Sequence, residues 1–179
     1  MITIYQSELY TMKTLTKFKL LPLGLAVWYT ERHGEYVETV SREMPYPYEE
    51  SLATALTHLR PHLMILTEMV DGLTPDEAQA LMGADRYRVT GVTWGKDSCG
   101  VTLVGRKELR GNKVLNLVAP FTKFDDEFEE YMYSEGLYIA ICDLEAEILE
   151  YIDGTKRGES PQLAIDFSTN PSTDDEVPH

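Results

Sequence analysis

The alternation of apolar and polar residues predicts that the chain begins with β-structure. Residues 14 to 30 are rich in Leu, Val, Trp and Tyr, and alternation resumes over residues 35 to 41, after His33 and Gly34. Two strands joined as a hairpin are the simplest interpretation of this pattern. Two prolines in residues 44 to 48 exclude both a helix and ladder pairing, so we expect an extended loop there.

Helical periodicity follows this loop. Over residues 49 to 70, Leu and Val recur at intervals of three and four positions, which is the spacing of one helical face. Pro61 lies inside this pattern and should kink or split the helix. Thr74 and Glu77 then have the spacing of a capping box around a proline, so a second short helix should start at Thr74 and end near Gly83.

Three β-rich segments and an acidic helix complete the predicted order. Residues 87 to 94, 100 to 108 and 113 to 117 suit an antiparallel meander. Apolar positions over residues 125 to 151 suit a long helix, with residues 134 to 136 as a point of interruption and Gly154 as its C-cap. The order predicts an α+β fold, with an antiparallel sheet of about five strands and helices packed on one face.

One domain is expected over residues 13 to 154, between an N-terminal extension of residues 1 to 12 and a flexible acidic tail of residues 155 to 179. The length of 179 residues and the hydrophobic content of 43% fit one compact domain. Two cysteines form no disulfide framework, which makes a reducing, cytoplasmic location the default. We expect no membrane span, because no stretch approaches the ~20 apolar residues that one needs. The oligomeric state stays open, with a homo-oligomer among the alternatives.

The charge is divided between segments. A net charge of −14 argues against a protein that grips phosphate with its whole surface, yet residues 83 to 123 carry +5 and residues 124 to 153 carry −11. Basic residues interleaved with aromatic ones suit single-stranded nucleic acid, because cations meet phosphates and flat rings meet bases. Strand parity would place Arg86, Arg88 and Trp94 on one face. The predicted nucleic-acid-binding residues are Arg86, Arg88, Trp94, Lys96, Arg106, Lys107, Arg110 and Lys113.

Each charged segment also has a more ordinary interpretation. The cations of the meander can simply face solvent on a half-covered sheet, or neutralise an acidic helix packed nearby. The carboxylates of residues 125 to 153 can form a solvated helix face, or they can imitate DNA phosphates for a basic partner.

No catalytic motif emerges from the sequence. His58 and His62 share a helix face, but no third metal ligand stands at a telling distance. Asp143, Glu147 and Glu150 have helical spacing, whereas a nuclease needs carboxylates from several elements around a cleft. We therefore expect a non-enzymatic protein without a metal or cofactor.

The last residues contain two peptide-like features. Residues 162 to 167 resemble the bacterial sliding-clamp-binding peptide, which begins with Gln-Leu and closes with an aliphatic and an aromatic residue. This resemblance implies a sliding clamp or another replication protein as partner, while docking on the parent domain is the alternative. Residues 174 to 179 resemble the acidic tip of bacterial and phage single-stranded DNA-binding proteins, with His179 where that family has Phe. The anchors that the first resemblance implies are Gln162, Leu163, Ile165 and Phe167.

Parts of the meander, residues 89 to 92, 100 to 105 and 114 to 121, resemble small phage and mobile-element proteins of replication or recombination cassettes. The leading hypothesis is an accessory protein of phage-type DNA replication or recombination. It would bind single-stranded DNA through the meander and a partner through the tail. The rival hypothesis is an acidic DNA mimic or inhibitor that binds a basic host or defence protein through residues 125 to 153.

Overall fold

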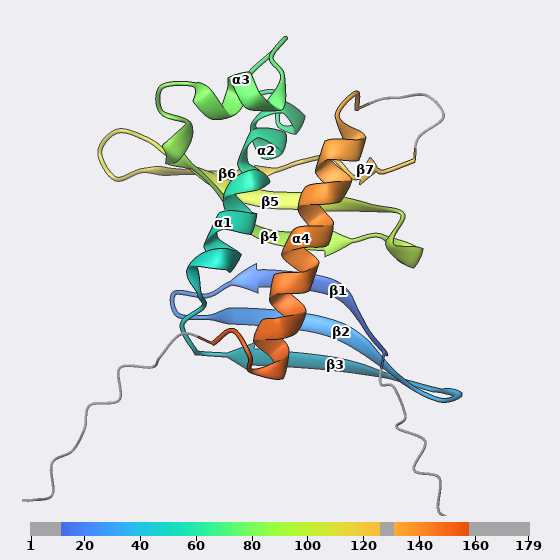
Figure 1. The fold of residues 1–179 in the computed structure, drawn as a ribbon. Helices are drawn as coiled ribbons and strands as arrows, with labels where there is room; N and C mark the ends of the chain where they lie inside the picture. Colours follow the sequence, from blue (N-terminus) through green and yellow to red (C-terminus); the bar gives the residue numbers. More distant parts are fainter. Residues whose placement is uncertain (1–11, 126–130, 158–179) are drawn as a thin grey trace, which may run out of the picture.

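A computed structural model describes residues 12 to 125 and 131 to 157. One antiparallel sheet carries the helices on a single face (Figure 1), which confirms the predicted α+β class. The strand order is β3-β2-β1-β4-β5-β6, with β7 paired to β5, so the sheet has seven strands rather than about five. The strands are β1 (Met12–Leu20), β2 (Leu25–His33), β3 (Tyr36–Met44), β4 (Tyr87–Trp94), β5 (Gly100–Glu108), β6 (Val114–Val118) and β7 (Thr122–Lys123).

The N-terminal segment contains one strand more than its sequence pattern predicts. Residues 14 to 30 do not form a single strand, because the chain reverses between Leu20 and Leu25 and pairs β1 with β2. Gly24 makes this reversal with a φ of 85°, a left-handed conformation that favours glycine. A Cβ atom on Gly24 would lie 2.0 Å from the carbonyl oxygen of Met44, so the turn also requires the absence of a side chain.

Strand β1 joins the two halves of the sheet. It pairs with β2 along its whole length, but with β4 only through Lys17 to Lys19 opposite Gly91 to Thr93. These contacts link residues more than seventy positions apart, and local sequence patterns do not reveal such pairs. The same pairing decides which side chains of the N-terminal strands lie next to those of the meander.

The helical layer follows the predicted breaks. Helices α1 (Glu50–His58) and α2 (Arg60–Leu66) are separate, with Pro61 in the first turn of α2. Helix α3 (Pro75–Ala80) begins with the expected capping box between Thr74 and Glu77. Helix α4 (Ser134–Asp153) ends at Gly154, as expected, but it begins at the predicted interruption, because residues 131 to 133 before it are not helical.

The core lies between the helices and the covered face of the sheet (Figure 1). Phe18, Val92 and Leu103 of neighbouring strands are almost fully buried, as are Leu63 of α2 and Leu144 of α4. Burial of such apolar side chains is the main favourable term in folding. Of the helices in residues 12 to 125 and 131 to 157, none is long and apolar enough to cross a membrane.

Candidate nucleic-acid interface

The sheet face that the helices leave uncovered brings cations and an indole together. Lys17 of β1 lies between Trp28 of β2 and Thr93 of β4, and cross-strand partners share one face of a sheet. The Lys17 Nζ lies 5.1 Å from the centre of the Trp28 ring, a cation–π contact. Lys17 is exposed and Trp28 is half-buried, so both are accessible on this face.

The register assigns further residues to the same surface. Thr93 of β4 pairs with Thr102 of β5. Further along the same two strands, beyond the Gly91–Val104 pair, Arg88 pairs with Arg106. Lys19 stands opposite Ala26 and Gly91, whose small size leaves its side chain exposed. We call this surface the open face, and define it by Thr14, Lys17, Lys19, Trp28, Thr30, Arg88, Thr93, Thr102 and Arg106.

Trp94 is not on the open face, contrary to the parity argument. A β-bulge between Val89 and Gly91 inserts one residue into β4, so the parity of the strand changes between Arg88 and Trp94. Trp94 pairs with Val101 on the covered face, is 6% exposed, and packs against Phe18 with ring centres 6.3 Å apart. A base cannot stack on a ring in this position.

The other predicted cations are distributed over several surfaces. Lys107 lies on the covered side, with its Nζ 4.7 Å from the centre of the buried Tyr87 ring. Arg86 is exposed in the short turn just before β4. Lys96 is exposed in the connection between β4 and β5, so these two cations lie at opposite ends of β4. Arg110 and Lys113 are exposed in the connection between β5 and β6. Of the eight predicted residues, the open face therefore includes only Arg88 and Arg106.

A charge count by segment does not reveal Lys17 and Lys19, and the place of Trp28 beside them depends on the pairing of β1 with β2. Residues 1 to 48 have no net charge, which hides the fact that Lys17 and Lys19 share a face. One acid of this segment, Glu43, lies on the same face, because it pairs with Ala26, the partner of Lys19. The signal in the sequence is the polar alternation of β1, in which Lys17 and Lys19 flank the buried Phe18. The pairing of β1 with β4 could not be read from it.

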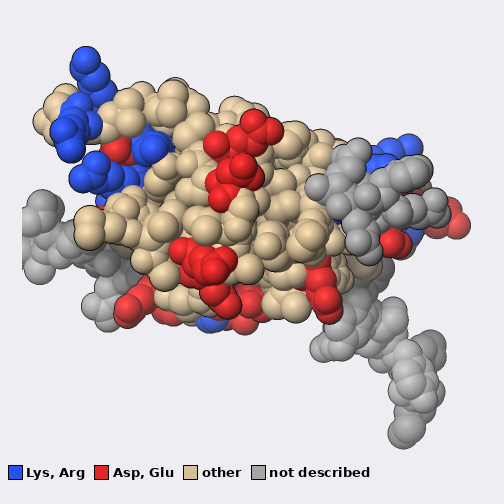
Figure 2. Space-filling model, turned by 90° about the horizontal axis from the view of Figure 1, so that it is seen from above, with Lys and Arg blue, Asp and Glu red and all other residues tan. Residues whose placement is uncertain are grey.

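The longest helix, α4, carries a large group of acidic residues. Figure 2 shows one group of Lys and Arg at the left end, a second at the right end, and Asp and Glu over the middle and the lower side of the view. Several carboxylates of α4 have basic partners. Glu147 lies 2.7 Å and Glu150 3.0 Å from the Lys156 Nζ, and Asp153 pairs with Lys13. Hydrogen bonds from Lys156 and Ser51 hold the pKa of Glu147 below its usual value.

A buried histidine lies within the helical layer, in α2. His62 is 4% exposed, and its Nδ1 lies 2.7 Å from the Tyr131 hydroxyl. Desolvation lowers the pKa of His62 to about 4, so the ring is neutral at pH 7. His58 is exposed, and it belongs to α1 whereas His62 belongs to α2, so the two histidines do not lie on one continuous helix.

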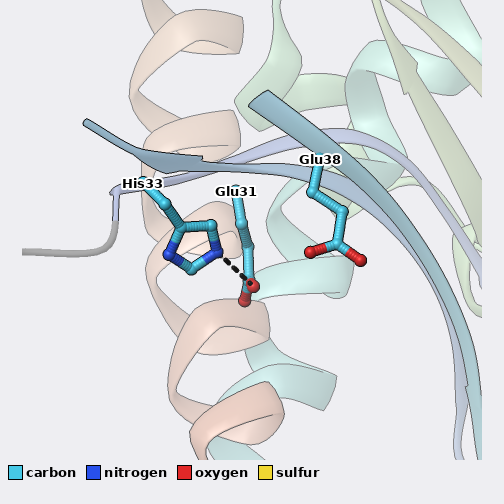
Figure 3. Close-up of side chains that lie close together, drawn as sticks. All are labelled: Glu31, His33 and Glu38. Carbon is cyan, nitrogen blue, oxygen red and sulfur yellow. Dashed lines mark ion pairs between the residues drawn. The ribbon is translucent and has the colours of Figure 1, made fainter. Parts of the chain in front are cut away.

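Within the described ranges, one group of side chains has ligand atoms close enough for a cation. Glu31, His33 and Glu38 lie at the end of the β2–β3 hairpin with their ligand atoms within 4.8 Å of one another (Figure 3). Glu31 and Glu38 are direct cross-strand partners, and His33 Nε2 lies 3.5 Å from Glu31. His33 and Glu38 are exposed, and groups of this kind are common on protein surfaces without an ion, so we assign no metal here.

In comparisons with known proteins, no family model matches this chain, and no curated protein or solved structure matches it significantly. The predicted tail anchors, Gln162, Leu163, Ile165 and Phe167, lie outside the described residues.

Proposed function

We propose that this chain is a non-enzymatic accessory protein that binds single-stranded nucleic acid on the open face of its sheet. The observation that carries the proposal is the adjacency of Lys17 and Trp28 on a face without helices. Proteins that bind single strands combine cations for the backbone with aromatic rings for the bases. In this proposal Trp28, and not Trp94, is the residue on which a base stacks. The cations that meet the phosphates include Lys17 and Lys19 of β1 as well as Arg88 and Arg106.

The division of charge supports this choice of surface. The open face has Lys17, Lys19, Arg88 and Arg106 beside two acids, Glu43 and Glu108, whereas the acids of α4 lie with the helical layer. A strand of phosphates would therefore be attracted to one side of the protein and repelled from the other, despite the net charge of −14. The replication or recombination setting, and a clamp as partner of residues 162 to 167, rest on the sequence resemblances alone.

The rival function, a DNA mimic acting through α4, has less support. A mimic needs carboxylates that are free to meet a basic partner. Glu147 and Glu150 already share Lys156, and Asp153 pairs with Lys13. Glu145 is half-buried, and desolvation raises its pKa, which disfavours its charged form.

Fluorescence anisotropy with a labelled oligothymidylate of about 20 nucleotides tests the proposal. We expect binding at low salt that weakens as salt rises. In Lys17→Gln the affinity should fall, and the slope of log affinity against log salt should decrease by about 0.7, the loss of one phosphate contact on a single strand.

Arg42→Gln is the matched control, because it removes one positive charge from the opposite side. Arg42 pairs with the buried Val27 and lies 6.0 Å from the centre of the Tyr29 ring, on the covered face. The proposal is wrong if wild-type protein does not bind at low salt, or if Lys17→Gln and Arg42→Gln weaken binding equally.

A further inference from the structure

The sheet opens between the C-terminal end of β1 and the first half of β4. The two strands pair only through residues 17 to 19 and 91 to 93, so residues 87 to 90 do not pair with β1. A pocket of about 840 Å³ is lined by this half of β4, the turn that follows β1, helix α1 and strand β5. Its volume lies in the range of small-molecule sites.

Three arginines from three different elements line this pocket. They are Arg60 of α2, Arg88 of β4 and Arg106 of β5, and the acid among the lining residues is Asp85. The lining therefore has a net positive charge in a protein that is strongly negative as a whole. Positive charges that line one pocket repel one another, and a bound anion would relieve that repulsion.

In two of these guanidinium groups the Nε atom lacks an acceptor. The Nε atoms of Arg60 and Arg106 are buried, and neither has a hydrogen-bond partner among the described residues. A buried N–H group without an acceptor costs free energy, and the cost is larger when the group is charged. The third arginine has only a weak partner, because Arg88 Nε lies 3.4 Å from Glu108 at an exposed position.

We propose that this pocket binds a phosphate monoester, either a free nucleotide or the terminal phosphate of a nucleic-acid strand. The planar guanidinium fork matches phosphate oxygens, and charge-assisted hydrogen bonds of this kind are strong. The rest of the lining suits the organic part of such a ligand. It consists largely of apolar and aromatic side chains, Leu20, Leu21, Pro22, Tyr48, Leu56 and Val89.

The pocket shares Arg88 and Arg106 with the open face, so these two residues do not distinguish the two sites. Arg60 and Lys17 do, because Arg60 belongs to the helical layer and Lys17 does not line the pocket. Loss of single-strand binding in Lys17→Gln therefore reports on the open face, whereas binding of a mononucleotide reports on the pocket.

Isothermal titration calorimetry with thymidine monophosphate and with inorganic phosphate, at constant ionic strength set by chloride, tests the proposal. We expect both to bind wild-type protein and to raise its unfolding temperature with concentration. Arg60→Gln and Arg106→Gln should each weaken binding by about tenfold or more, since each removes a charge-assisted hydrogen bond. Arg42→Gln is the control, because Arg42 lies on the edge strand β3 and does not line the pocket, so this variant should keep wild-type affinity.

Asp85→Asn gives a change in the opposite direction. It removes the negative charge of the lining with almost no change of shape, so phosphate should bind more tightly than to wild type. An unfolded or damaged variant cannot show such a gain. The proposal is overturned if neither probe binds more strongly than chloride, or if Arg60→Gln and Arg106→Gln keep wild-type affinity.

Two oligonucleotides that differ only in a 5′-phosphate distinguish the sources of the phosphate. Tighter binding of the phosphorylated strand, lost in Arg60→Gln, identifies a strand end as the ligand. Equal binding of the two strands, together with tighter binding of thymidine monophosphate than of inorganic phosphate, identifies a free nucleotide. Both results support the phosphate site.

Discussion

Lys17 and Trp28 are direct cross-strand partners, and the Lys17 ammonium covers the Trp28 ring at 5.1 Å from its centre. An exposed cation–π contact is worth about 0.5 to 1 kcal/mol, whereas stacking of a base on an aromatic ring is worth about 1 to 3 kcal/mol. Under the proposed function, a base would displace the ammonium with a net gain. The released Lys17 side chain would then be available to the phosphate, so one pair of residues would serve both parts of the ligand.

Replacement of Trp28 by leucine should weaken single-strand binding. We expect about a tenfold loss of affinity, the lower end of what one stacked base contributes. The matched control is Tyr36→Leu, which removes an exposed aromatic side chain, 82% accessible, that pairs with His33 on the other side of the sheet. Anisotropy titrations of both variants measure the difference, and equal losses would contradict the assignment of Trp28.

Binding should also quench tryptophan fluorescence. Of the two tryptophans, Trp28 is accessible and Trp94 is buried, so stacked bases should quench the first. Trp28→Phe should abolish the change in emission on adding oligothymidylate. If quenching persists at wild-type strength in Trp28→Phe, the bases lie near Trp94 instead.

Stability should fall in acid because of His62. In the unfolded chain its pKa is near 6.5, and in the folded protein it is about 4, so the unfolded state binds the proton more readily. The contribution of neutral, buried His62 is complete above pH 6.5 and is lost as pH falls to about 4. The loss amounts to about 3 kcal/mol over this window.

Urea unfolding of wild type and His62→Gln between pH 7 and pH 4 measures this effect. Carboxylates contribute equally to both proteins, so the difference between the two curves isolates His62. The variant should be less stable at pH 7, because Tyr131 loses its partner, and should lose less stability on acidification. Parallel curves would contradict the burial of a neutral ring.

Gly105 allows α2 to pack against β5. A Cβ atom there would lie 2.3 Å from Leu63 Cδ2 and 2.5 Å from the Arg88 carbonyl oxygen. Gly105→Ala should therefore destabilise the protein by about 1 to 3 kcal/mol through overpacking. Gly136→Ala is the contrasting variant, because its Cβ would lie 3.6 Å from the nearest atom, and alanine in a helix should stabilise by about 0.5 to 1 kcal/mol. Thermal unfolding of both variants should give shifts of opposite sign.

The Tyr151 hydroxyl fixes the end of α4 to the proline-containing loop before α1. Its oxygen lies 2.9 Å from the Met44 carbonyl oxygen and 2.6 Å from that of Tyr46. Tyr151→Phe leaves these carbonyls without this donor and should cost about 1 to 3 kcal/mol in urea unfolding. Tyr36→Phe, at an exposed ring, should change the stability little, and a Tyr151→Phe protein as stable as that control would refute the role of the hydroxyl.

Local signals predicted the helices well. Pro61 separates α1 from α2, and Thr74 and Glu77 form the capping box. Gly154 ends α4 with a φ of 86°. Each signal acts within a few residues, since it depends on a missing N–H group, a side-chain cap or a left-handed φ. The start of α4 is the exception. The apolar pattern predicts a helix from residue 125, but residues 131 to 133 are not helical and α4 begins at Ser134.

The candidate site depended on contacts that local patterns do not contain. The bulge near Thr90 moved Trp94 to the covered face, and the pairing of β1 with β4 placed Lys17 beside Thr93. One inserted residue reverses the direction of every later side chain in a strand, because the repeat of a strand is two residues. Segment charges could not show which cations would share a surface.

The sequence by itself determined the α+β class, the breaks between helices and the separation of basic from acidic segments, because these follow from periodicity, capping and composition. Only the tertiary structure decided that Trp28, and not Trp94, lies on the open face beside Lys17, and that Arg60 shares a pocket with Arg88 and Arg106. The physical reason is the non-local pairing of strands. It sets the register and the face of each side chain through contacts between residues that are distant in the chain.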